Sequence, residues 1–102
     1  MRASEKTKSS IEELIEILKK ERPDLYLASR YATKEDRINA LYKLMKRGEI
    51  YHPKKLAEEW QKTYGIPISR VAVSHYLAIL GSTGRVEYRG RGAHGRNLYR
   101  KP

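Results

Sequence analysis

The chain has 102 residues, which is enough for one domain with a single modest core. Its 22 Lys and Arg against 12 Asp and Glu give a formal net charge of +10, which favours a polyanionic partner over an acidic metabolite. The chain has no Cys, so disulfides and thiolate metal sites are excluded, and its three His residues do not recur at zinc-ligand spacing.

The positive charge is concentrated at the C-terminal end. Residues 69–102 carry seven basic side chains and one acidic side chain, whereas residues 1–68 carry fifteen and eleven. The first ten residues lack the apolar segment of a secretory signal, and no apolar run is long enough to span a bilayer. We therefore expect a cytoplasmic protein that contacts no membrane.

The N-terminal part is expected to form a tail and then a helix. Residues 1–8 are polar and charged, which is typical of a flexible tail or of an arm that orders on binding. Ser10 and Glu13 have the spacing of a capping box and predict a helix up to Lys20. This helix must bury its apolar stripe against the domain or against a second copy of the chain. The stripe consists of Ile11, Leu14, Ile15 and Leu18.

A second short helix is expected after Pro23. Residues 24–32 are apolar and aromatic, and Asp24 is a candidate cap for that helix. The segment 9–32 is thus predicted to be a helical extension, and it is a candidate dimerisation element.

Two further helices and a strand are predicted between Thr33 and Gly65. Thr33 and Asp36 have capping-box spacing, and apolar residues follow at helical spacing up to the glycine at position 48. Residues 49–51 are β-compatible and predict one small strand. Pro53 suits a first helical position and Gly65 a helix end, so the second helix is expected between them. Its buried face comprises Leu56, Ala57, Trp60 and Tyr64.

The stretch from Ser69 predicts a helix with two unlike faces. Ser69 is the expected N-cap, and Gly81 is the expected C-terminal stop, so the helix should cover residues 69–80. One face is apolar and should be buried; it carries Val73, Tyr76, Leu77 and Leu80. The opposite face is small and polar and can approach another macromolecule closely; it carries Val71, Ser74, His75 and Ala78.

The last part of the chain predicts a β-hairpin with a basic tip. Residues 85–89 alternate, with Val86 and Tyr88 on one face, and residues 97–101 resume an extended pattern. Between them, residues 90–96 read GRGAHGR, which is glycine-rich and cationic. The glycine spacing fits no nucleotide-binding fingerprint, and no helix follows to supply a dipole.

The order helix, small strand, helix, tight turn, helix and hairpin resembles the winged helix-turn-helix family of DNA-binding proteins over residues 33–101. The sequence also resembles that family, which includes small bacterial and archaeal repressors. Family members tend to have a leucine-rich first helix that ends in Gly-Glu and a second helix with Leu-Ala-Glu. The corresponding residues here are Leu41, Leu44, Gly48, Glu49, Leu56, Ala57 and Glu58.

The third helix carries the most specific part of the resemblance. Family recognition helices tend to read Ser-x-x-Thr-Val-Ser-x-His-Leu-x-x-Leu-x-x-x-Gly-x-Val. This chain matches at Ser69, Val73, Ser74, Leu77, Leu80, Gly84 and Val86. It departs at Ala72, where Thr is common, and at Tyr76, where His is common. The basic hairpin is similar in composition to those of small winged-helix proteins from archaeal viruses and plasmids.

The resemblance implies an α+β fold that is mainly helical with a small sheet, with an extra N-terminal helix before the domain at 33–102. It also implies that the third helix enters the major groove of double-stranded DNA and that the hairpin lies on the minor groove or phosphate backbone. The implied DNA-binding residues are Ser69, Arg70, Ser74 and His75 on the helix, and Arg89, Arg91, His94 and Arg96 on the hairpin. His75 is otherwise an exposed helix residue, and Arg70 could instead pair with an acidic neighbour.

The predicted function is therefore that of a sequence-specific transcriptional regulator, acting as a homodimer through the N-terminal helix and associated with DNA in the cytoplasm. The alternatives are a non-specific DNA-coating protein, as in plasmid partition, and a winged-helix module that docks to another protein. No nucleophile and base occur at recognisable spacing, so an enzyme is not expected. Neither a cofactor, a metal nor a small-molecule ligand is implied.

Overall fold

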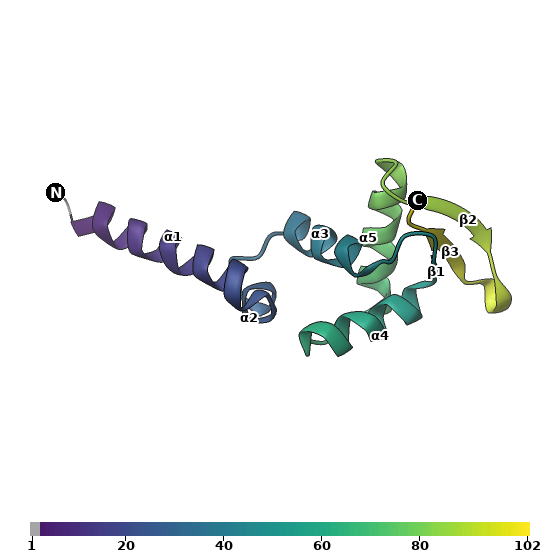
Figure 1. The fold of residues 1–102 in the computed structure, drawn as a ribbon, viewed down its shortest axis with the longest axis horizontal. Helices are drawn as coiled ribbons and strands as arrows, with labels where there is room; N and C mark the ends of the chain where they lie inside the picture. The colour runs from purple at the N-terminus through teal and green to yellow at the C-terminus, as the bar shows by residue number, and fades with distance from the viewer. Residues whose placement is uncertain (1–2) are drawn as a thin grey trace. The chain divides into compact units, whose positions relative to one another are not determined.

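The computed structural model describes residues 3–102, with side chains from Ser10 onward, and the chain divides into two units, residues 1–33 and residues 34–102 (Figure 1). The described chain is mainly helical and contains a small three-stranded antiparallel sheet, so the α+β class is confirmed. Among the described helices, none combines the length and the apolar character needed to cross a membrane.

The first unit contains helices α1 (Ala3–Glu21) and α2 (Pro23–Ala28). The predicted start of α1 at Ser10 is wrong, because residues 3–9 contain neither Pro nor Gly and continue the helix toward the N-terminus. Of the expected tail, residues 1–2 lie outside the described part of the chain and residues 3–8 are helical.

Helix α2 begins without the expected cap. Pro23 is its first residue, and Asp24 lies in the first turn, where it pairs with the Arg22 guanidinium at 3.1 Å. Hydrogen bonding to Arg22 lowers the pKa of Asp24 below its usual range. The prediction that Asp24 caps this helix is therefore wrong, because the helix begins at Pro23 and its N-cap position is Arg22.

The second unit contains helices α3 (Lys34–Leu44), α4 (Pro53–Tyr64) and α5 (Arg70–Ser82), which surround one apolar core. Each contributes side chains that are at most 1% exposed. The largest of them are Trp60, Leu41, Leu56, Leu77, Leu80 and Val73. Burial of such side chains is the main favourable contribution to folding, at ~1.5–3 kcal/mol each.

Helix α4 begins and ends as its sequence predicts. Pro53 occupies the first turn, and Gly65 adopts the left-handed conformation at the C-cap, with φ of 70°. The cap at the N-terminal end was not anticipated: His52 accepts a hydrogen bond from the Lys55 backbone N–H through Nδ1 at 3.1 Å. Only a neutral imidazole can accept this bond.

We therefore expect acid to destabilise the chain through His52. Burial, together with the positive charge of Arg96, lowers the pKa of His52 below its ordinary value of 6.5. The unfolded chain then binds a proton more readily, so this contribution to the free energy of unfolding is full above pH 6.5 and is lost as the pH falls toward the folded-state pKa. Urea titrations of His52→Ser, which keeps a cap that does not titrate, should show a weaker loss in acid. An unchanged pH dependence in this variant would contradict the assignment.

Helix α5 has the predicted N-cap but a different end. The Ser69 Oγ accepts a hydrogen bond from the Ala72 N–H at 3.0 Å. The helix runs through Gly81, and the left-handed residue is Gly84, with φ of 77°. The Arg85 N–H donates to the Leu80 carbonyl at 2.9 Å, which closes a Schellman motif. The predicted stop at Gly81 is therefore wrong.

The sheet is formed by β1 (Ile50–Tyr51), β2 (Glu87–Arg91) and β3 (Asn97–Arg100), in the order β1-β3-β2 with antiparallel pairing. Tyr99 on the central strand pairs with Tyr51 on one side and Tyr88 on the other. Val86 immediately precedes β2, and Tyr88 lies on the same face of the sheet as its cross-strand partner Tyr99, with the two ring centroids 5.4 Å apart. Val86 is buried, whereas Tyr88 is 55% exposed.

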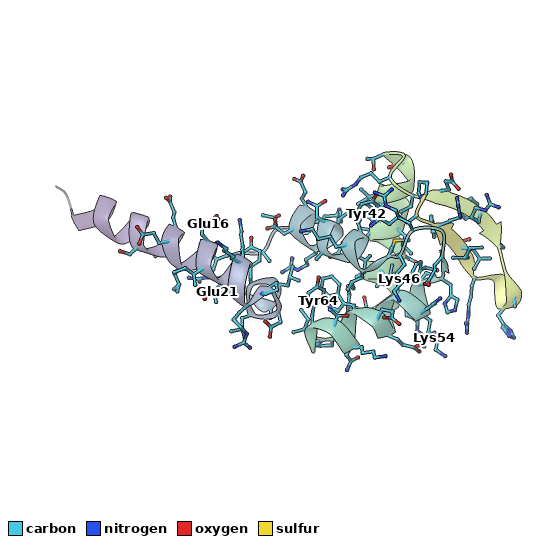
Figure 2. All side chains as sticks on the ribbon, in the orientation of Figure 1. Glu16, Glu21, Tyr42, Lys46, Lys54 and Tyr64 are labelled. Carbon is cyan, nitrogen blue, oxygen red and sulfur yellow. The ribbon has the colours of Figure 1, made fainter. Side chains whose placement is uncertain are left out.

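A cationic cluster around Tyr42 ties α3 to the end of the sheet. The Arg85 guanidinium lies 4.4 Å from the centroid of the Tyr42 ring, and the Lys101 ammonium lies 4.0 Å from it. Lys101 also donates to the Tyr42 carbonyl at 3.2 Å. Tyr42 is labelled in Figure 2. These contacts hold both ends of the hairpin against the helical core.

Candidate nucleic-acid interface

Helix α5 presents a continuous outward face to solvent. This face consists of Val71, His75, Ala78 and Ser82, which recur at helical spacing and are all exposed. On the opposite side, Val73, Leu77 and Leu80 have no exposed surface. The prediction of two unlike faces is confirmed, except that Tyr76 is only partly buried.

The four candidate residues at this end of the domain lie at the N-cap and in the first two turns of α5. Arg70 is the first helical residue and is exposed, and no described acidic side chain pairs with it. Ser69 uses one lone pair of its hydroxyl for the cap, which leaves its O–H free to donate. His75 is exposed, and Ser74 is partly buried at the edge of the outward face.

The other four candidates lie on the hairpin of residues 87–100, which we call the basic hairpin. A register shift between Tyr88 and Arg91, with Gly90 at φ of 83°, marks a bulge that increases the local twist. The tip is a short 3₁₀ turn, η1 (Ala93–Gly95), and the Gly92 N–H donates to the Arg96 carbonyl across it at 2.7 Å. A Cβ on Gly92 would lie 2.9 Å from the Leu98 Cδ1, so glycine permits the two strands of the hairpin to approach closely.

The basic hairpin has more positive charge than its acidic neighbour can neutralise. Glu87 is the one acidic residue between positions 60 and 102. It pairs with Arg100 at 3.2 Å and with Arg89 at 3.8 Å. No described acidic side chain pairs with Arg91, which is exposed, or with Arg96, which is partly buried. Their charges are therefore available to an external anion.

The basic hairpin is fixed to the C-terminal end of α5. The Arg85 and Val86 N–H groups both donate to the Leu80 carbonyl, at 2.9 and 3.3 Å. A Cβ on Gly81 would lie 3.6 Å from the Tyr99 ring, so the central strand packs directly on the helix. Figure 1 shows β2 and β3 extending away from the end of α5 toward the tip. These backbone hydrogen bonds and this packing therefore fix the basic hairpin relative to α5.

His94, at the tip, adopts a backbone conformation that favours glycine, with φ of 62°. We expect His94→Gly to raise the free energy of unfolding by ~0.5–1 kcal/mol, because the left-handed conformation costs a side-chain-bearing residue ~1–2 kcal/mol and the greater entropy of glycine in the unfolded chain offsets part of that gain. If the imidazole contacts DNA, the same variant should bind a duplex more weakly. Gly95→Ala is the control, because it introduces a side chain at φ of 68°. It should destabilise the hairpin without removing a candidate contact. A His94→Gly variant that binds DNA normally would remove His94 from the interface.

Val71, on the outward face, was not among the candidate residues. Val71 is 79% exposed, more than any other large hydrophobic side chain of the described chain. The sequence could have identified Val71, because it is an apolar residue on the polar face of an amphipathic helix.

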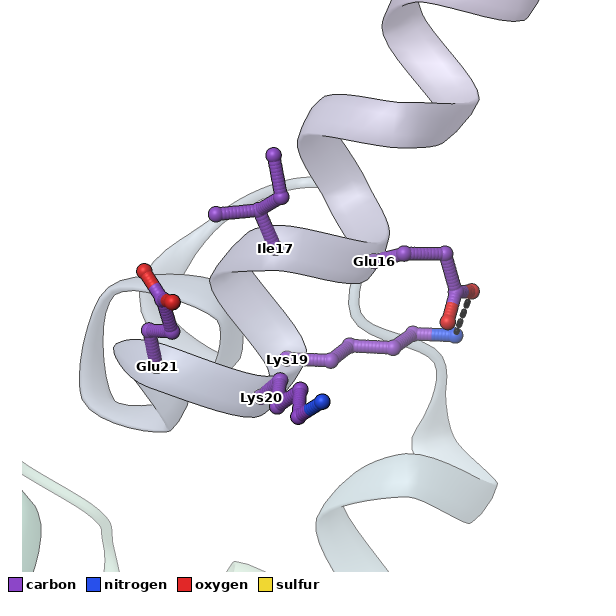
Figure 3. Close-up of a pocket in the computed structure, with 5 residues that line it drawn as sticks. All are labelled: Glu16, Ile17, Lys19, Lys20 and Glu21. Atoms are coloured by element: carbon purple, nitrogen blue, oxygen red, sulfur yellow. Dashed lines mark ion pairs between the residues drawn. The ribbon is translucent and has the colours of Figure 1, made fainter.

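Two hollows are also lined by described residues. One, of about 560 Å³, follows the last turns of α1 and is lined by Glu16, Ile17, Lys19, Lys20 and Glu21. In Figure 3 the Glu16–Lys19 ion pair, at 3.7 Å, lies on one side and Ile17 points away from it, so no reactive groups converge. The other, of about 430 Å³, lies between α3 and the end of α5 over Ile38, Ile79 and Leu80.

Within the described chain, no three His, Asp or Glu side chains are grouped as metal ligands would be.

Comparison of the chain with protein-family models, with curated proteins and with solved structures finds no significant match. The function must therefore be inferred from the geometry and charge of the described residues.

Proposed function

We propose that residues 34–102 form a winged helix-turn-helix domain that binds double-stranded DNA. Three features of the fold support this proposal: the element order α3-β1-α4-α5-β2-β3, the five-residue connection between α4 and α5, and the strand order β1-β3-β2. In this proposal α5 is the recognition helix and the basic hairpin is the wing.

One observation carries the proposal. Helix α5, which exposes a face of mostly short side chains, and the basic hairpin, which carries unpaired arginines, are held together in one unit. The only acidic residue of these two elements, Glu87, is already paired with two arginines. A duplex offers a groove for the first and a line of phosphates for the second. Protein docking would explain the exposed helix face but not the excess of arginine.

The proposed contacts divide into two classes. Arg91, Arg96 and Arg89 on the wing neutralise phosphates, which supplies affinity and register without reading sequence. Arg70, at the start of α5, reaches a guanine edge, for which a good bidentate pair gives ~1–3 kcal/mol of discrimination. Ser74 and His75 add weaker contacts to base edges.

Equilibrium binding to a labelled duplex of mixed sequence tests this proposal. We expect binding at low salt, with an observed association constant that falls with a log–log slope of about −2.7 or steeper, because each of the three wing arginines contributes about −0.9. The single strand of the same sequence should bind more weakly, because a groove is needed to admit α5. No binding of the intact chain at low salt would contradict the proposal.

We further propose that the protein acts as a transcriptional regulator in the form of a homodimer paired through α1. Ile11, Leu14 and Ile17 are 41, 57 and 52% exposed and leave an apolar surface on this helix. A two-fold pair would place the two copies of α5 about 34 Å apart, one turn of DNA, over a palindromic site. Sedimentation equilibrium should show a dimer for the intact chain and a monomer for Leu14→Lys. A monomer at all concentrations would contradict this part of the proposal.

A further inference from the structure

The exposure of Val71 has no explanation in the fold. Its side chain lies in the first turn of α5, on the face opposite the core, and is 79% exposed. Valine is also a weaker helix former than the polar residues that would suit a solvated position. Neither burial nor helix stability therefore accounts for an apolar residue here.

The surroundings of Val71 allow a large partner to reach it. Because Val71 is 79% exposed, neither His75 one turn later nor any other described side chain shields the valine. Arg70 precedes it and His75 follows one turn later on the same side of α5. These neighbours present hydrogen-bonding groups around one apolar contact.

The floor of the major groove offers one type of apolar group to such a contact. This group is the 5-methyl of thymine, which 5-methylcytosine also carries, whereas the other groups that distinguish the base pairs there are hydrogen-bond donors or acceptors. Valine has neither donor nor acceptor, and its β-branched side chain is held in essentially one rotamer on a helix, so little conformational entropy is lost when it packs. Residues at the N-terminal end of a recognition helix are the ones that reach base edges.

We propose that Val71 reads the 5-methyl group of a pyrimidine in the major groove, beside the guanine contacted by Arg70. This inference rests on the proposed binding of α5 in that groove. Burial of one methyl group against the valine should change affinity by about 3- to 10-fold, the equivalent of one methyl-sized apolar contact.

The test uses the intact chain and a site enriched from a random-sequence duplex pool. Each thymine of the site is replaced in turn by deoxyuridine, which removes only the methyl group. We expect one position in each half-site at which the replacement weakens binding about 3- to 10-fold. At that position, 5-methylcytosine should bind more tightly than cytosine, which identifies the methyl group itself as the ligand.

Two variants separate the valine from other sources of the effect. Val71→Ala should reduce the ratio of thymine to uracil affinity toward one, and the coupling in this double-mutant cycle excludes a general effect of uracil on the duplex. Ala78→Ser, on the same face, should keep the wild-type ratio. Because Val71 is exposed, its replacement should change stability little.

The outcomes separate this inference from the function on which it depends. If Val71→Ala keeps the wild-type ratio, or if no thymine is sensitive to replacement, the reading of a methyl group by Val71 is wrong while DNA binding stands. If the chain does not bind DNA at low salt, both are wrong.

Discussion

Replacement of Arg89, Arg91 and Arg96 together by alanine should weaken binding to a mixed-sequence duplex by about two orders of magnitude near physiological salt. Each phosphate contact contributes about −0.9 to the slope of log affinity against log salt, so the slope should become shallower by about 2 to 3. The change in slope should be close to 2 if Glu87, which pairs with Arg89 at 3.8 Å, already neutralises part of the charge of Arg89. Fluorescence anisotropy over a series of salt concentrations measures both quantities.

The matched control removes three positive charges elsewhere. Lys43, Lys46 and Lys62 are exposed and lie on α3, on the connection after it and on α4, outside the proposed interface. Their joint replacement by alanine changes the net charge equally but should leave most of the affinity and the salt slope. Equal losses in the two triple variants would assign binding to net charge alone, and full affinity in the arginine variant would remove the wing from the interface.

Trp60→Ala should lower the free energy of unfolding by ~3–5 kcal/mol, the usual cost of deleting a buried aromatic side chain. Trp60 is 1% exposed at the centre of α4, and its ring packs edge-on against Tyr64 at 4.8 Å between centroids. A loss of this size is a large part of the stability of a small domain. Urea denaturation followed by circular dichroism provides the measurement.

Trp60→Phe separates packing from hydrogen bonding at this position. The buried indole Nε1 has no hydrogen-bond acceptor among the described residues. Phenylalanine removes this unsatisfied donor, whose burial costs ~1–3 kcal/mol, and keeps most of the apolar surface. We therefore expect it to be far less destabilising than alanine. Equal losses for the two variants would contradict this account, because the aromatic surface that phenylalanine keeps would then contribute nothing to stability.

The sequence predicted helix boundaries best where the signal is local. Pro53, Gly65 and Ser69 act on their own turns, and each occupies the position that its chemistry indicates. The end of α5 was mispredicted because the run Gly81 to Gly84 offers two glycines, either of which could form a helix end. The left-handed residue is Gly84, with φ of 77°, whereas a Cβ at Gly81 would make an ordinary van der Waals contact with the Tyr99 ring at 3.6 Å.

The candidate site could be predicted only in part. The exposure of Arg70 and His75 follows from the helical period, which the sequence contains. The partners of Glu87 could not be predicted, because its pairing with Arg100 depends on the register of the two strands of the hairpin. The His52 cap was also missed, since histidine is not among the usual capping residues.

The most direct test of sequence-specific DNA binding is equilibration of the intact chain with a random-sequence duplex pool at two salt concentrations, followed by sequencing of the bound fraction. We predict that raising the salt reduces the bound fraction steeply and that a palindromic motif is enriched, with half-sites about one helical turn apart. Binding without enrichment at either salt concentration would contradict sequence-specific recognition, and no binding at the lower one would contradict DNA binding altogether.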